Sequence, residues 1–390
     1  MVSEKISGYA DKSILKSFSA GVVYLYCIKF KFVLLKKMKI YHCVGVMSGT
    51  SLDGLDIALC EFERVKHTWH YNILKASTIP YNADWKNKLS GAGNLSGFEL
   101  VKLDKEYGAF IGEQINHMLA DDVKFNVSFI ASHGHTVFHR PDMGVNLQIG
   151  NGSVIAAQTG LPTVTNFRDL DIALGGQGAP LVPYGDEQLF GDYYYCLNLG
   201  GFANISFRYK QKRIAYDIGP ANIVLNYLSK KTGKDFDYGG NIARNAAFDP
   251  ELFVQLNSLD FYMQPYPKSL GKEWLDDVFI PVLDGSSVAD DIKIRTCTEH
   301  IAAQIGKSLN SRGRKKVLVT GGGAYNSFLI ELINKYTLHE ILIPENGLVE
   351  YKEALIFAFL GMLRIRNEIN TLASVTGAKF NHSGGIVCHP

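Results

Sequence analysis

The sequence predicts an α/β protein built from two similar lobes, and two observations support this fold class. Short apolar runs typical of buried strands alternate with segments that have the apolar spacing of helices. A strand–glycine turn–strand pattern also occurs twice, over Ile40–Phe62 and again over Tyr193–Tyr209. This weak repeat at the head of each half indicates two related lobes that face a cleft.

Further elements follow from local patterns. The apolar runs Val127–Ser132 and Val317–Thr320 predict buried strands. Helical spacing of apolar residues predicts three helices, over Leu100–Leu119, Thr298–Leu309 and Glu353–Ile365. Residues 239–275 combine prolines with aromatic residues and predict a helix followed by an extended loop. That loop is either a wall of a substrate cleft or an ordinary surface connection.

Composition and charge limit the classes of partner. The chain has 390 residues, enough for two to three domains, and its 40 Lys and Arg nearly balance 38 Asp and Glu. Such a balance provides no overall attraction to nucleic acid or to an anionic membrane. The six cysteines are scattered without a CxxC pair, which argues against a structural metal site and suits a reducing compartment. We therefore expect a cytoplasmic protein with no nucleic-acid partner and no stable membrane association.

The first forty residues hold the most membrane-like segment, Phe18–Leu35. Lys29 and Lys31 interrupt it, and each would cost about 2.5–3.5 kcal/mol at the centre of a bilayer. A signal peptide would need a small-residue cleavage site, which the segment lacks. Because a strand-like run begins directly after Met38, we expect residues 1–37 to be an extension that arises from a misassigned start.

The turn between the first two predicted strands is unusually rich in polar residues. Glycines there let backbone amides face an anion, and the hydroxyls of Ser48, Thr50 and Ser51 add donors. Asp53 and Asp56 suit a phosphate that carries Mg²⁺, because this ion prefers hard oxygen ligands. The alternative is a plain hairpin with Asx-turns. The residues predicted to bind nucleotide are Gly49, Thr50, Ser51, Leu52, Asp53, Gly54, Leu55 and Asp56.

Two more glycine turns follow strand-like runs. In "NLGGFANIS" the candidates are Gly200, Gly201 and Asn204, although this motif alone is a common hairpin signal. In "VLVTGGGAYN" a buried strand ends in three glycines before a helix predicted from Asn326, which allows a nucleoside to lie against bare backbone. The motif matches neither a Walker A nor a Rossmann pattern, and a tight strand–helix turn is the alternative. The candidates here are Gly321, Gly322, Gly323 and Asn326.

Two other motifs carry reactive side chains. In "NFRDLDIALGGQGAPLVPYGD", Arg168, Asp169 and Asp171 precede a glycine-rich loop stiffened by proline, a good place for a positioned base. A salt-bridged surface loop is the alternative, above all for Asp169. The motif "SHGHTVFHRP" contains three histidines but no acidic ligand, so hydrogen bonds to a polar substrate or to a turn are favoured over zinc.

Taken in this order, the motifs resemble the 1,6-anhydro-N-acetylmuramic acid kinase family. The matching strings run from Val44 to Gly361: "GVMSGTSLDGLDIAL", "SHGHTVFHRP", "NFRDLDIALGGQGAPLVP", "NLGGFANIS", "DIGPANIVLN", "VTGGGAYN" and "KEALIFAFLG". The resemblance implies the two-lobed, ribonuclease H-like fold that hexokinase, actin and Hsp70 share. It places lobe I at 38–175, lobe II at 176–349, and at 350–390 a helix that returns to lobe I, plus a tail.

The resemblance also implies a reaction. The sugar's O6 is tied into a 1,6-anhydro ring, so water attacks C1 while the freed O6 takes the γ-phosphoryl group of ATP. The products are N-acetylmuramic acid 6-phosphate and ADP, in peptidoglycan recycling. By resemblance Asp171 is the base for the water, as a carboxylate is in inverting glycosidases. Asp53 would hold Mg²⁺, and a homodimer is expected. The residues expected to contact the sugar are His133, Thr136, Arg168, Asp217 and Glu353.

Several points stay open. Glu353 has an alternative role as an exposed helix-start carboxylate that favours the helix dipole. Asn166, Ala221 and Asn226 depart from the family pattern, which leaves details of the sugar pocket undefined. Two other functions are considered: a different sugar or small-acid kinase of the same fold, and a non-catalytic nucleotide-driven binder like actin or Hsp70.

Overall fold

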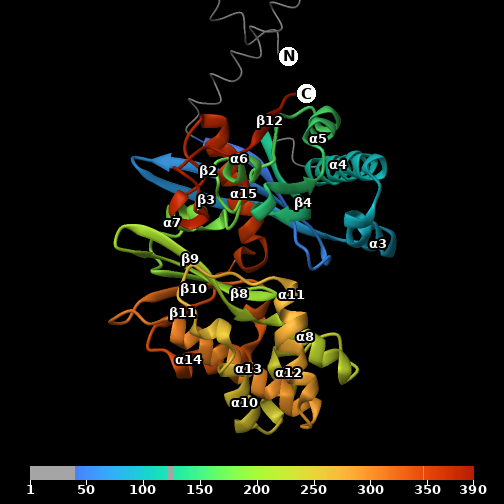
Figure 1. Cartoon of the computed structure of the whole chain (residues 1–390). Coiled ribbons are helices and arrows are strands. Elements are labelled where there is room, and N and C mark those ends of the chain that lie inside the picture. Colours follow the sequence, from blue (N-terminus) through green and yellow to red (C-terminus); the bar gives the residue numbers. More distant parts are fainter. Residues whose placement is uncertain (1–39, 121–125, 346) are drawn as a thin grey trace, which may run out of the picture.

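A computed structural model describes residues 40–120, 126–345 and 347–390 (Figure 1). The expectation for residues 1–37 lies outside the described residues. Two groups of elements, each built around a sheet, lie one above the other in Figure 1. Among the described residues, no helix combines the length and the apolar character needed to cross a bilayer.

The first sheet has seven strands in the order β12-β6-β4-β1-β2-β3, with β5 paired to β4. Strands β1, β2 and β3 are antiparallel neighbours, whereas β4 runs parallel to β1, and β6 runs parallel to β4. The strands are β1 (Ile40–Ser48), β2 (Gly54–Val65), β3 (Thr68–Pro80), β4 (Val127–Arg140), β5 (Val145–Ile149), β6 (Thr163–Thr165) and β12 (Ile386–Cys388).

The second sheet repeats the central part of the first. Its order is β11-β10-β7-β8-β9, with an antiparallel run β7-β8-β9 and parallel neighbours β7, β10 and β11. The strands are β7 (Tyr195–Leu199), β8 (Phe202–Tyr209), β9 (Lys212–Pro220), β10 (Lys316–Thr320) and β11 (Glu340–Leu342). One topology therefore occurs twice, and the predicted two-lobed α/β fold class is confirmed.

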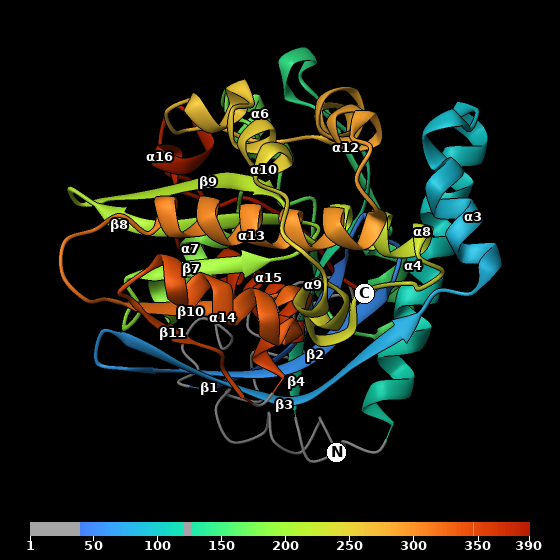
Figure 2. The same ribbon diagram turned by 90° about the horizontal axis from the view of Figure 1, so that it is seen from below.

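Helices cover both sheets, and α13 crosses one face of the second sheet (Figure 2). The α-helices are α3 (Ala83–Gly91), α4 (Gly97–Leu119), α5 (Gly152–Thr159), α6 (Asp169–Ala173), α7 (Val182–Leu189), α8 (Asn222–Lys231), α9 (Asn241–Asn245), α10 (Pro250–Asn257), α11 (Lys272–Trp274), α12 (Ile280–Gly285), α13 (Asp290–Ser308), α14 (Ser327–Tyr336), α15 (Leu348–Arg366) and α16 (Ala373–Thr376). Short 3-10 or π turns are η2 (Ala92–Asn94), η3 (Pro141–Met143), η4 (Tyr238–Gly240), η5 (Asp260–Met263), η6 (Leu275–Phe279) and η7 (Gly322–Tyr325).

The predicted helices are present as α4, α13 and α15. Helix α4 starts after a capping box, in which Ser96 and Glu99 each bond the backbone amide of the other. Helix α13 starts at Asp290, earlier than predicted. The single helix expected after residue 239 was wrong in detail, because Asp249 caps a new helix, α10, that begins at Pro250.

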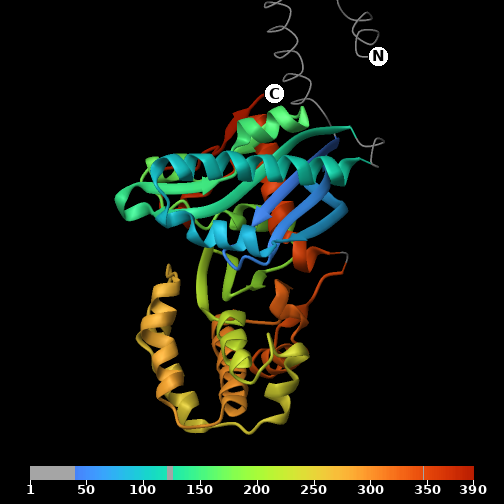
Figure 3. The same cartoon turned by 90° about the vertical axis from the view of Figure 1, so that its right-hand side faces the viewer.

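Helix α15 positions the candidate site. It packs against β1, β2 and β4, and buried residues occupy most of its length because it also contacts β10 and α7. Gly45 of β1 has no room for a side chain because the backbone of Ala354 lies directly against it. Figure 3 shows this helix, in red, running through the upper half toward the lower one. The lobe boundaries predicted near 175 and 349 stay predictions.

Candidate active site

Asp171 lies on the short helix α6 and is fully buried, at 0% exposure. Its Oδ2 accepts a hydrogen bond of 2.7 Å from the Gly178 amide, and its Oδ1 accepts one of 2.7 Å from the Thr376 hydroxyl. Gly176 packs so closely on Oδ2 that a Cβ there would collide with it. Since a carboxylate offers about four lone-pair positions, these bonds orient the group and still leave acceptor capacity.

The neighbouring acid, Asp169, has different surroundings. Its Oδ1 accepts from the Asn146 amide at 3.0 Å and its Oδ2 from the Asn166 amide at 2.8 Å. Asn166 has a positive φ of 55°, so this bond secures a strained turn just before α6. Asp169 therefore connects its loop to β5 and does not belong to a surface salt bridge.

Arg168 lies between the motif acids and the histidine motif. Its Nε and one terminal nitrogen donate to His133 Nε2 at 3.1 and 2.8 Å, and the other terminal nitrogen donates to Gly178 O at 2.6 Å. Because His133 Nδ1 lies 2.9 Å from a carbonyl, Gly134 O, which can only accept, Nδ1 carries the proton and Nε2 accepts. Burial, assisted by the charge of Arg168, lowers the pKa of His133 well below its usual range. The neutral ring therefore orients the guanidinium.

Charge around Arg168 keeps it a cation. Burial lowers its pKa to about 10, and the negative charges of Glu353 and Asp171 oppose this shift. Burial likewise raises the pKa of Glu353, which the charges of Lys352 and Arg168 lower and those of Asp56 and Asp186 raise. Helix α15 begins at Leu348, so Glu353 lies beyond its first turn. Its side chain is also half-buried, and the alternative role as an exposed carboxylate at the helix start is therefore wrong.

The predicted phosphate hairpin connects β1 to β2. The Ser48 hydroxyl behind it is buried and lies 2.9 Å from both His135 Nδ1 and the Tyr81 hydroxyl. Asp56 accepts a 2.6 Å hydrogen bond from Thr78. Burial raises the pKa of Asp56, and the charges of Asp53 and Glu350 raise it further. A carboxylate in this environment would gain from a nearby cation.

The glycines of the three turns fall into two groups. In the first group a Cβ would approach another protein atom to 2.7 Å or less, so packing explains the glycine: Gly54, Gly321 and Gly323. In the second group the nearest atom to a Cβ would be 3.4 Å or more away: Gly49, Gly200, Gly201 and Gly322. Packing within the chain does not require glycine in the second group, which leaves space against the backbone for a ligand.

The remaining predicted residues occupy several places. Thr136 accepts from the Gln148 side chain at 3.3 Å. Asn204 lies in register with Asp217 on β9, where burial raises the pKa of the carboxyl and Oδ2 accepts from the Leu270 amide at 2.9 Å. Asn326 caps α14 by accepting from Leu329 N at 3.0 Å. In the part of the chain that the structure describes, the hydrogen bonds given for these residues go to partners other than Asp171.

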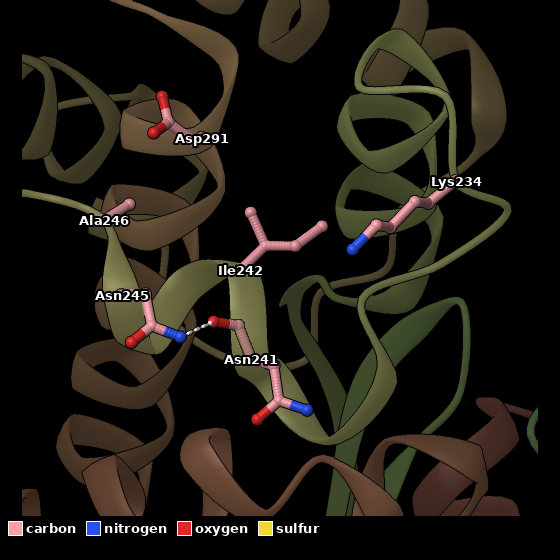
Figure 4. Close-up of a pocket in the computed structure, with 6 residues that line it drawn as sticks. All are labelled: Lys234, Asn241, Ile242, Asn245, Ala246 and Asp291. Carbon is pink, nitrogen blue, oxygen red and sulfur yellow. Dashed lines mark hydrogen bonds between the residues drawn. The ribbon is translucent and has the colours of Figure 1, made fainter.

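A pocket lies beside the third glycine turn, and four of its six lining residues come from the segment 239–275. Gly240, just before α9, packs directly on the Asn326 side chain, so the pocket adjoins the turn. Its cavity volume of about 320 Å³ is at the small end for a ligand site. In Figure 4 the side chains of Lys234 and Ile242 point toward each other across it. The lining residues are Lys234, Asn241, Ile242, Asn245, Ala246 and Asp291.

The duplicated α/β fold with glycine turns at the ends of equivalent strands defines the two-lobed class of hexokinase, actin and Hsp70. Over residues 41–389 the chain matches the family model of anhydro-N-acetylmuramic acid kinase. The chain belongs to this family, and it is therefore a kinase, a phosphotransferase. The resemblance predicted from the motifs is confirmed.

Two curated relatives illustrate the similarity, and both are named anhydro-N-acetylmuramic acid kinase. The protein of Aliivibrio fischeri is 32% identical over 369 residues, covering 88% of this chain and 98% of the relative. That of Shewanella amazonensis is 34% identical over 365 residues, covering 86% and 95%. Among solved structures, component A of (R)-2-hydroxyglutaryl-CoA dehydratase from Acidaminococcus fermentans has a TM-score of 0.43 and 11% identity, covering 83% of this chain and 99% of that chain. That likeness is too distant to bear on function.

Proposed function

We propose that this kinase uses ATP and water to convert anhydro-N-acetylmuramic acid into N-acetylmuramic acid 6-phosphate, with ADP, in peptidoglycan recycling. A bond forms between the water oxygen and C1 while the C1–O6 bond breaks. O6 then forms its bond to the γ-phosphorus as the bond to ADP breaks. The observation that carries the proposal is the environment of Asp171. This buried carboxylate is oriented by hydrogen bonds from Gly178 and Thr376 and interacts with the charge of Arg168.

Asp171 takes the proton of the attacking water, a role worth about 10²–10⁴-fold in rate. Because the side chain is fully buried, the sugar and its water reach it when the loop 175–178 moves or the lobes open. Gly175 and Gly178 both have positive φ, which glycine adopts without strain.

The sugar, in this proposal, lies against Arg168 and Glu353, with Thr136 and Asp217 as further contacts. Arg168 is a cation that suits the carboxylate of a muramic acid. Glu353 lies near enough to Arg168 for their charges to interact. His133 acts indirectly, since both of its ring nitrogens bond protein groups.

ATP fits the three glycine turns. The four glycines with free space around a Cβ supply the bare backbone that phosphates and a nucleoside need, and Gly322 belongs to the turn next to the pocket of Figure 4. We assign that pocket to the nucleobase. Asn204 and Asn326 frame the second and third turns.

Asp53 and Asp56 would hold Mg²⁺ at the hairpin. Within the described ranges no three His, Cys, Asp or Glu side chains are grouped as a metal site. Mg²⁺ commonly keeps several waters and takes only one or two carboxylates together with substrate phosphates, so two acids fit the ion. When bound, it would neutralise phosphate charge.

Compartment and assembly belong to the same proposal. Cys43, Cys60, Cys196 and Cys297 are buried free thiols, which suits the reducing cytoplasm where ATP is available. We also propose a homodimer, on the resemblance alone. Size-exclusion chromatography with light scattering tests the assembly.

The function is tested by incubating the protein with ATP, Mg²⁺ and the anhydro sugar in ¹⁸O-labelled water. We expect ADP and a phosphosugar with label at C1. A phosphosugar without label would indicate a kinase acting on an existing hydroxyl, and ADP without phosphosugar would indicate a nucleotide-driven binder. Asp171→Asn should keep ATP binding and lose about 10²–10⁴-fold in kcat. Near-normal turnover would remove the base assignment.

A further inference from the structure

The C-terminal tail, residues 370–385, returns to the candidate base. Thr376, the last residue of α16, is 1% exposed, and its hydroxyl lies 2.7 Å from Asp171 Oδ1 across 205 residues of sequence. The other acceptor within reach of this hydroxyl, Leu372 O, is 3.3 Å away. The shorter, charge-assisted bond therefore goes to the carboxylate.

Backbone bonds hold the tail against the glycine loop that carries the second donor. The Gln177 amide donates to Thr376 O at 2.8 Å, and the Lys379 amide donates to Leu174 O at 3.2 Å. The tail also contacts the second lobe, where the Ser374 hydroxyl donates to Arg213 O at 3.3 Å. Thr376 is thus part of a packed unit and not of a loose terminus.

The two donors act on opposite oxygens of Asp171. The terminal torsion of an aspartate is broad, so the plane of the carboxylate turns easily unless hydrogen bonds fix it. Gly178 N binds Oδ2 and Thr376 binds Oδ1. His382 Nε2 lies 3.5 Å from Oδ1 and its Nδ1 lies 3.2 Å from Phe380 O, so the Thr376 hydroxyl, at 2.7 Å, makes the shorter contact with this oxygen.

We propose that Thr376 is a positioning residue for the base, and this inference rests on the proposed function. Its hydroxyl fixes the carboxylate plane so that the free lone pairs of Asp171 face the attacking water. Misplacement of a reacting group by 1 Å can cost about 10²-fold in rate, so loss of this bond should be visible in kcat.

The test uses Thr376→Val, which removes the hydroxyl at nearly constant shape, and Thr376→Ser, which keeps it. We expect Thr376→Val to lower kcat about 10–100-fold with little change in KM for ATP, and Thr376→Ser to restore most of the rate. Wild-type kcat in Thr376→Val, or equal loss in the serine variant, would overturn the proposal. If the valine variant does not fold, Thr376→Cys supplies the comparison, because a thiol is a weaker donor, and its kcat should fall between those of serine and Asp171→Asn.

A double variant separates positioning from structural damage. In Asp171→Asn/Thr376→Val the valine should cost nothing further, because the base it positions is gone. A multiplied loss would show that Thr376 acts elsewhere. Should Asp171→Asn turn over normally, the base assignment fails together with this inference. Should Asp171→Asn be inactive while Thr376→Val keeps its kcat, only the inference fails.

Discussion

Lys352 Nζ lies 2.8 Å from Asp186 Oδ1, an ion pair that joins α15 to α7 with exposures of 4% and 3%. Asp186 Oδ2 also accepts a 2.5 Å hydrogen bond from Ser206, and Arg213 lies 3.7 Å from the same oxygen. Burial lowers the pKa of Lys352, but the charge of Asp186, its hydrogen bond to Lys352 and the charge of Cys196 together outweigh burial, and the net shift is upward. One anion therefore serves two buried cations.

This imbalance predicts unequal effects of removing the partners. Asp186→Asn should cost about 3–5 kcal/mol of stability, because it leaves Lys352 and Arg213 without a counter-charge. Lys352→Met should cost less, because Asp186 keeps Arg213 and Ser206. Urea unfolding monitored by circular dichroism measures the free energy of unfolding of both variants. A larger loss of stability in Lys352→Met than in Asp186→Asn would contradict this prediction.

The third glycine turn allows structure and ligand binding to be separated. In Gly323→Ala the new Cβ would lie 2.7 Å from the Leu199 side chain, whereas in Gly322→Ala the nearest atom is 3.9 Å away. We expect Gly323→Ala to lower the melting temperature, since overpacking costs about 1–3 kcal/mol. Gly322→Ala should leave the melting temperature unchanged but raise KM for ATP. An unchanged KM would remove the turn from the nucleotide site.

Arg168 should not tolerate lysine. Lysine keeps the charge but loses the fork that bonds His133 twice and Gly178 O once. We expect kcat/KM for the sugar to fall about 10–100-fold, the equivalent of the 1.5–3 kcal/mol that a bond to a charged group contributes. Steady-state kinetics with Arg208→Lys as an exposed control checks this, and equal kinetics for both variants would rule out the role.

The two hairpin acids should control the Mg²⁺ requirement. If Asp53 and Asp56 hold the ion, Asp56→Asn should raise the Mg²⁺ concentration for half-maximal activity about tenfold, roughly 1.4 kcal/mol. Titration of activity with Mg²⁺ provides the measurement. Asp84→Asn, which removes a surface carboxylate paired with Lys88, is the matched control. Identical titrations for both variants would exclude the hairpin.

A buried histidine in the second lobe should make the protein sensitive to acid. Burial lowers the pKa of His300 to about 3. The unfolded chain takes up this proton below about pH 6.5, whereas the folded chain does so only near pH 3, so stability falls as the pH drops through this window. From pH 7 to pH 5 the loss from this group is about 2 kcal/mol.

Substitution of His300 isolates this contribution. His300→Gln keeps a polar partner for Tyr262, which lies 2.9 Å from His300 Nε2, but cannot titrate. Its free energy of unfolding should therefore change less between pH 7 and pH 5 than that of the wild type. His70→Gln, at an exposed position, should behave like the wild type. Equal pH dependence for all three proteins would contradict the assignment.

Local sequence patterns predicted the strands β1, β2, β4, β7, β8 and β10, the helices α4, α13 and α15 and the glycine turns, because these depend on neighbours within a few positions. They did not indicate β3 or β9. The order of the motifs was enough to identify the family and to propose Asp171 as the base. The same patterns could not separate Gly54, where packing on β3 excludes a side chain, from Gly49, where space is free. Both positions are simply glycine in a polar turn.

Asp171 and Asp169 show where local information ends. Their motif marks both as candidate acids, but the sequence contains no signal that Thr376 would bond one of them and Asn146 the other. Likewise, a lysine beside the apolar run of α15 gives no hint that Asp186 neutralises it in the interior. The chain by itself determined which groups are available and which elements form. Only tertiary packing decided which groups meet, because contacts across 205 residues depend on how whole sheets and helices close on one another.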